Sequence, residues 1–176
     1  MYAHASKLLG QSVISLQSGE VVAWVNQPVL EIGNLEMIAL SCKSPHQKGQ
    51  LMLMARDIRQ FATDCVIVDS EDELTNPTEI VRLKSSLKHP YSPLDKLVVA
   101  DTGRKLGVVG DYTINLETNR VQKLYVRKPL FHAWLGSNLI IDRTQIIDIT
   151  PHRITVRDST VSSPILAPDT FPGTTP

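Results

Sequence analysis

Aromatic side chains and net charge are the two things this sequence has least of. Aromatic residues make up 5% of the 176 residues against 42% hydrophobic residues in total, so we expect aliphatic cores. Basic and acidic residues balance at 18 each, whereas a general nucleic-acid binder needs a strongly basic surface. No apolar run approaches the ~20 residues of a membrane-spanning helix, and the N-terminal residues do not resemble a secretory signal. We therefore expect a globular cytoplasmic protein with no stable membrane insertion.

The chain is also poor in residues that bind metals or act as nucleophiles. Its two cysteines, Cys42 and Cys65, lie in expected strands at a spacing that fits no zinc knuckle or redox pair, so we predict two buried or half-buried free thiols. The histidines are far apart and mostly next to turns, where exposed loop positions are expected: His4, His46, His89, His132 and His152. We predict no catalytic residue, no metal site and no cofactor, and therefore no enzymatic activity.

An internal repeat is the clearest positive signal. Residues 13–25 align with residues 97–109, and residues 34–40 align with residues 119–126 after a length change, which places Leu40 on Val126. Residues 51–68 resemble residues 139–156. Alternating apolar residues on both sides of polar turns predict a hairpin over residues 102–126 and five or six short strands in each half.

These patterns predict a mainly β protein made of two tandem, small antiparallel β-barrels with a connecting helix. The first barrel should span residues 1–70 and the second residues 92–158. A linker at 71–91 contains the helix, which begins at Asn76-Pro77 and ends before Pro90. The Pro/Ser/Thr-rich tail at 159–176 is expected to be disordered, although Ile165, Leu166 and Phe171 offer apolar side chains for docking.

Glycines mark the expected bends of the second half. Gly103 should adopt a positive φ in a tight turn, and Gly107 and Gly110 within one strand indicate bends or close strand packing. A phosphate loop would need a strand–loop–helix context that this segment lacks.

The second half resembles the PRC-barrel family, on Leu97–Gly103, on Arg104–Asp111 and on the closing Ile140–Asp142 and Ile146–Ile149. The first half is a more divergent copy, with Ala23 and Trp24 where the family favours glycine. Members include the C-terminal barrel of the ribosome maturation factor RimM and the cytoplasmic domain of the photosynthetic reaction centre H subunit. The resemblance implies a six-stranded, mostly antiparallel barrel used for binding, without a shared enzymatic activity or cofactor.

The loop at 127–138 is the candidate partner-binding site. Its counterpart at 43–50 is polar, whereas this loop combines basic residues with large apolar ones, as interaction hot spots do: Arg127, Lys128, Leu130, Phe131 and Trp134. The aromatic residues could equally stack on unpaired bases. The alternative is that Phe131 and Trp134 cover the end of the barrel or pack on the linker helix.

The function expected from these observations is that of a non-enzymatic binding or adaptor protein. By resemblance to RimM, its partners would be ribosomal or RNA-processing proteins. Three alternatives remain open, namely direct RNA binding through the 127–138 loop, an accessory role in a membrane complex like that of the H subunit, and an enzyme, which a deep pocket lined by convergent carboxylates or histidines would indicate.

Overall fold

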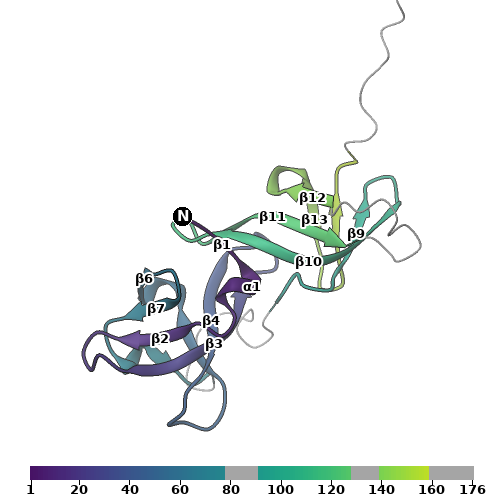
Figure 1. The fold of residues 1–176 in the computed structure, drawn as a ribbon. Coiled ribbons are helices and arrows are strands. Elements are labelled where there is room, and N and C mark those ends of the chain that lie inside the picture. The colour runs from purple at the N-terminus through teal and green to yellow at the C-terminus, as the bar shows by residue number, and fades with distance from the viewer. Residues whose placement is uncertain (78–90, 128–138, 159–176) are drawn as a thin grey trace, which may run out of the picture.

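The computed structural model describes residues 1–77, 91–127 and 139–158. The chain is mainly β, with sheet that curls like half of a barrel (Figure 1). The expected linker helix, most of the 127–138 loop and the tail at 159–176 lie outside the described residues.

Each half of the chain builds one seven-stranded sheet. The first half (residues 1–77) contributes a sheet with the order β6-β7-β2-β3-β4-β5-β8. Its strands are β2 (Ser12–Ser15), β3 (Val21–Leu30), β4 (Met37–Lys43), β5 (Leu51–Met54), β6 (Ile58–Phe61), β7 (Cys65–Val68) and β8 (Leu74–Thr75). Short 3-10 helices η1 (Ala55–Asp57) and η2 (Glu71–Glu73) precede β6 and β8.

The second half (residues 91–158) repeats this plan. Its sheet has the order β12-β11-β10-β9-β14-β13, and β1 pairs with β10 outside that order. Its elements are β9 (Leu97–Ala100), β10 (Lys105–Asn115), β11 (Arg120–Arg127), β12 (Leu139–Asp142), η4 (Arg143–Gln145), β13 (Ile146–Ile149) and β14 (Arg153–Val156). In both sheets the only parallel pair within the described residues joins the first strand to the last long one, β2 to β7 and β9 to β14.

The hairpin irregularities fix which residues of the two halves correspond. The β3–β4 ladder shifts register after Val25 and after Val29, and the β10–β11 ladder shifts after Val109 and Thr113, each 84 positions later. Both hairpins are therefore the same length. The sequence alignment of Leu40 with Val126 is wrong, because the ladders place Leu40 on Leu124; the length difference lies instead in the turn before each long strand.

Turn and strand glycines behave as their positions predict. Gly103 has a φ of +85°, which confirms the tight turn expected there. Gly107 has a φ of +146°, and a Cβ on it would collide with the carbonyl oxygen of Arg127, so β10 and β11 approach more closely there than a side chain allows.

The two halves meet through the tips of their long hairpins. The amide of Met37 donates to the carbonyl of Asn119 at 2.6 Å, and the amide of Val121 donates to the carbonyl of Leu35 at 3.1 Å. Glu36 bridges Arg120, its equivalent in the other half. Met37 and Val121 are equivalent residues of the two halves, and so are Leu35 and Asn119, so each half makes the same bond to the other. The contact therefore has the self-complementary pattern of a two-fold dimer.

The leading segments of the two halves are exchanged as well. β1 (Tyr2–His4), followed by the one-turn helix α1 (Ala5–Leu8), precedes the first sheet but pairs with β10 of the second sheet, where Ala3 lies beside Ile114. Tyr91 precedes the second sheet but bridges Leu30 of β3, and the amide of Leu30 donates to its carbonyl. The segment that leads into each sheet thus pairs with the other sheet.

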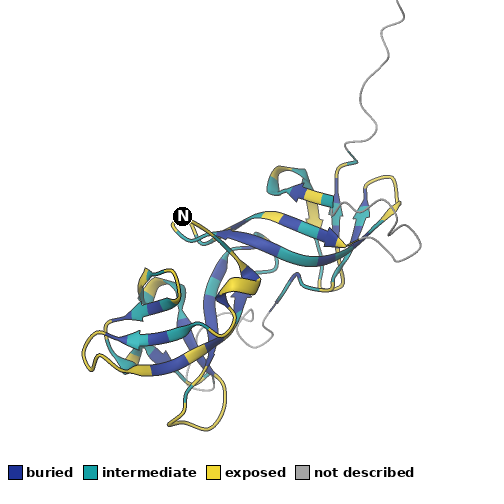
Figure 2. Cartoon of the chain, in the orientation of Figure 1, coloured by how far each residue is buried: buried dark blue, intermediate teal, exposed yellow. Residues whose placement is uncertain are grey.

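Most buried apolar side chains form one core that spans both halves, and a smaller cluster in the first half consists of Val29, Ala39 and Met52. The shared core includes Val13 and Leu40 from the first half and Leu124 and Ile154 from the second, all fully buried. Figure 2 shows the buried residues running along the long hairpin strands. The core is aliphatic with one fully buried tyrosine, Tyr112, as the scarcity of aromatic residues predicts. Cys42 is buried, Cys65 is half-buried, and both are free thiols, as expected.

Candidate functional site

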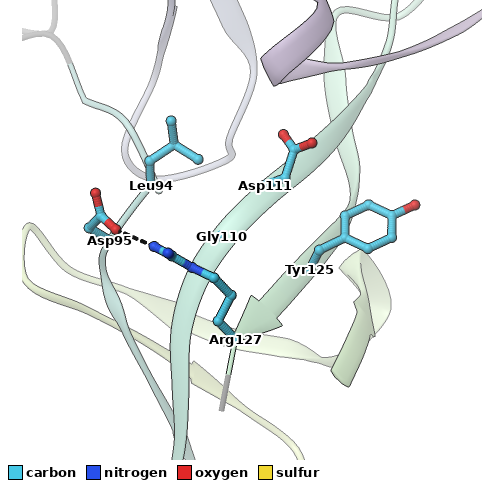
Figure 3. A pocket seen from close by; sticks show the side chains of 6 residues that line it. All are labelled: Leu94, Asp95, Gly110, Asp111, Tyr125 and Arg127. Carbon is cyan, nitrogen blue, oxygen red and sulfur yellow. Dashed lines mark hydrogen bonds and ion pairs between the residues drawn. The ribbon is translucent and has the colours of Figure 1, made fainter. Parts of the chain in front are cut away.

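A cavity of about 300 Å³ lies on the second sheet where β10 and β11 pass the segment that leads into β9 (Figure 3). It is lined by Leu94, Asp95, Gly110, Asp111, Tyr125 and Arg127. Asp111 of β10 and Tyr125 of β11 are paired directly opposite each other. Residues paired in this way share a face of the sheet, so both side chains lie on the cavity side.

Arg127 forms one wall of the cavity. Its side chain lies over Gly110, where a Cβ would come within 2.7 Å of its Cγ, and its guanidinium donates to Asp95 at 2.7 Å. Gly110 therefore makes room for the arginine side chain. The two partners are 59% and 79% exposed, and such a surface ion pair stabilises a fold by about 0–1 kcal/mol. Both groups can exchange this contact for one with a partner at little cost.

Asp111 forms the opposite wall, and its carboxylate is held by the N-terminal segment. Oδ2 accepts hydrogen bonds from Ser6 Oγ at 2.8 Å and lies 3.0 Å from His4 Nδ1, while Oδ1 accepts from the amides of Ser6 and Tyr112. The His4 ring packs on Tyr125 with centroids 5.0 Å apart. These four contacts hold the carboxylate in one orientation beside the cavity.

The equivalent position in the first half has a different chemistry. Here the residues that correspond to Asp95, Gly110, Asp111, Tyr125 and Arg127 are Gly10, Asn26, Gln27, Ser41 and Lys43. The position of Arg127 keeps a positive charge, but neither carboxylate nor the aromatic ring has a counterpart. The common fold therefore does not require these side chains, although Asp111 and Tyr125 also contact Ser6 and His4 of the N-terminal segment.

Of the partner-binding residues expected from the sequence, Arg127 lies in the cavity wall. Lys128, Leu130, Phe131 and Trp134 lie outside the described residues. The sequence analysis missed Asp95, Asp111 and Tyr125. An alignment of the halves at a constant 84-residue offset along the long hairpins would have exposed Asp111 and Tyr125 as differences.

His4 is exposed, as expected for the histidines, but it does not lie in a loop. It ends strand β1 and contacts Asp111 and Tyr125. The sequence gives no sign of this, because the contact joins residues 107 positions apart through the exchanged N-terminal segment.

The groups with shifted pKa values lie outside the cavity lining. Burial raises the pKa of the Cys42 thiol and of the Tyr91 hydroxyl to about 12, and it also raises the pKa of Tyr112. Hydrogen bonds from Thr144 lower the pKa of Asp142, which caps η4. Core burial and a cap explain these four shifts without a catalytic role.

Metal sites and membrane-spanning helices are two further features that can indicate a function. Among residues 1–77, 91–127 and 139–158, no group of three or more His, Cys, Asp or Glu side chains is placed to hold a metal ion. Over the same residues, no helix combines the length and apolar character needed to cross a bilayer.

Comparison with known proteins does not assign the chain to a family. No family model matches it, and no curated protein is similar to it in sequence.

Proposed function

We propose that this chain is a non-enzymatic adaptor built from two tandem PRC-type barrels joined by a linker helix, and that its second half binds a protein partner at the cavity around Arg127. The first half serves as the scaffold copy. By the resemblance to RimM, the partner belongs to ribosome maturation or RNA processing.

One observation carries this proposal. The halves share strand order and hairpin bulges, yet the cavity residues of the second half differ in charge and size from their equivalents. Because the same fold forms with Gln27 and Ser41 in place of Asp111 and Tyr125, we attribute the cavity side chains of the second half to binding rather than to packing. The Asp95–Arg127 pair also suits a protein partner, because exposed ion pairs at a rim steer association and set register.

The charges of the cavity favour protein over RNA. Two carboxylates and one guanidinium line it, so a phosphate group would meet more negative than positive charge. Direct RNA contact and a membrane-complex partner are the alternative outcomes of the experiment described next.

Affinity capture from native lysate tests the proposal, with Arg127→Glu as the variant and Lys43→Glu as its control. The two residues occupy the same register position in the two halves, and both are exposed. We expect RNase-resistant capture of ribosomal or RNA-processing proteins, with a loss of about tenfold or more for Arg127→Glu, since a reversed charge meets Asp95 and the partner. Lys43→Glu should leave capture unchanged.

Three results would contradict the proposal. Equal loss in both variants indicates a general charge effect, RNase-sensitive capture indicates RNA, and exclusive capture of membrane complexes indicates the accessory role. Phe131→Ala and Trp134→Ala, measured in the same way, test the sequence prediction for the loop that follows Arg127.

A further inference from the structure

The outer edge of β12 differs from the equivalent edge in the first half. In the first sheet β5 pairs with β4 on one side and with β8 on the other, where Met52 lies beside Thr75 and Leu53 beside Leu74. The equivalent strand β12 pairs with β11, and within the described residues no strand covers its other side. Apart from the Asp142 amide, which donates to Gln145, the backbone groups on that side therefore form a template for another strand.

The side chains along this edge show the same difference. In the first half a row crosses the sheet from Gln27 through Ser41 and Met52 to Thr75, and Met52 is 2% exposed. The matching row runs from Asp111 through Tyr125 to Ile140, which is 52% exposed. A large aliphatic side chain thus stands in solvent at the position where the first half buries a methionine.

The row also connects this edge to the cavity. Tyr125 lines the cavity and lies directly beside Ile140, so the two features form one continuous surface across β10, β11 and β12. Neighbouring strands are about 4.8 Å apart, so a strand added to β12 would lie roughly 10 Å from Tyr125. A protein that contacts the cavity comes within reach of the edge.

Nothing in β12 itself opposes pairing. Proteins usually protect an open edge with lysine, proline, a bulge or an inward-pointing charge. The strand sequence is Leu-Ile-Ile-Asp, its ladder with β11 is regular, and its one carboxylate, Asp142, is occupied in capping η4. An apolar edge strand without these protections suits a binding surface.

We propose that an extended segment of the protein partner adds to the edge of β12 as an antiparallel strand, in the place that β8 takes in the first half. This rests on the proposed adaptor function and names the form in which the partner binds. The residue opposite Ile140 is uncharged and apolar, because a charge there would be desolvated against the isoleucine. Main-chain hydrogen bonds supply the affinity, and contact with Ile140 and Tyr125 supplies the specificity.

The experiment measures hydrogen exchange of the β12 amides in the full-length protein, with and without a synthetic peptide as probe. The probe is acetyl-Thr-Val-Thr-Leu-Thr-Val-amide, an uncharged segment of high strand propensity, added up to millimolar concentration. Ile140→Lys is the blocking variant, since a charge at an edge opposes strand addition. Ile147→Lys is the matched control, because Ile147 on β13 is also 52% exposed.

We expect the outward amides of residues 139–141 to exchange rapidly in the free protein and about tenfold or more slowly with the probe; the amide of Asp142 is left out because it already donates to Gln145. Ile140→Lys should weaken probe binding about tenfold or more, and Ile147→Lys should change it less than about twofold. The proposal is overturned if these amides are already protected without the probe, which would show that the chain covers its own edge. It is equally overturned if the probe leaves exchange unchanged, or if both lysine variants weaken binding alike.

This outcome is separable from that of the proposed function, because the probe requires no natural partner. If the probe slows exchange while Arg127→Glu leaves lysate capture intact, the edge site stands and the cavity does not.

Discussion

Replacing Gly107 with alanine tests how closely the long strands of the second half approach each other. A Cβ at this position would overlap the carbonyl oxygen of Arg127 and come within 2.9 Å of Val126 Cγ1. The obstacle is backbone rather than the flexible end of a side chain, so it cannot move aside without shifting β11. The φ of +146° also disfavours any side chain.

The expected cost combines two effects. Overpacking a tight contact costs about 1–3 kcal/mol, and a backbone conformation that side chains avoid costs about 1–3 kcal/mol. We therefore expect Gly107→Ala to lower the free energy of unfolding by roughly 2–6 kcal/mol. For a chain of this length each kcal/mol lowers Tm by about 2–4 °C, so thermal and urea unfolding both resolve the effect.

Two comparisons make this result interpretable. Gly33 has open space around the Cβ position and no positive φ, so Gly33→Ala should change stability by less than about 0.5 kcal/mol. Ala23, the residue equivalent to Gly107, is fully buried without a positive φ and tolerates its Cβ. If Gly107→Ala were as stable as Gly33→Ala, the close approach of β10 and β11 described above would be wrong.

The remaining predictions concern an ion pair and the two thiols. The side chain of Asp158 is 7% exposed and accepts two hydrogen bonds of 2.9 Å from Arg104, so Asp158→Ala should lower the free energy of unfolding by about 1–2 kcal/mol. Asp69 is exposed, so Asp69→Ala should lower it by less than about 0.5 kcal/mol. In the native protein Cys65 should react with a thiol reagent and Cys42 only after unfolding, as thiol titration in urea will show. Burial raises the pKa of Cys42 from 9.0 to about 12, so the buried thiol contributes its full stability below pH 9 and loses it as the pH rises toward 12. The urea midpoint of the protein should therefore fall over that pH range, and it should fall less in Cys42→Ala.

Local patterns were enough to predict most of the strands. Alternating apolar residues and turn glycines identify the 102–126 hairpin, and the turn conformation of Gly103 follows from its place between two strands. The repeat is visible because both halves bury the same positions. The hairpin alignment failed because Leu35 adopts the left-handed conformation that Asn119 adopts in the other half, and leucine gives no turn signal.

The candidate site was harder to predict because its parts come from distant segments. Arg127 was found from its neighbours in sequence, but Asp111 depends on Ser6 and His4, which reach it only through the exchanged strand β1. No periodicity encodes such an exchange. The outer edge of β12, which no strand of the described residues covers, could not be predicted either, since it is defined by comparison with β8 in the finished fold rather than by its own residues.

The exchange of leading segments and the reciprocal hairpin contact have a consequence for how such a protein can change over generations. In a homodimer of identical chains, every substitution appears at two symmetric places and must suit both. Here the two places belong to one chain, so a residue such as Asp111 can change while its equivalent, Gln27, stays as it is. The shared core and the crossed strands keep the halves together, which leaves one copy free to acquire a binding surface while the other preserves the fold.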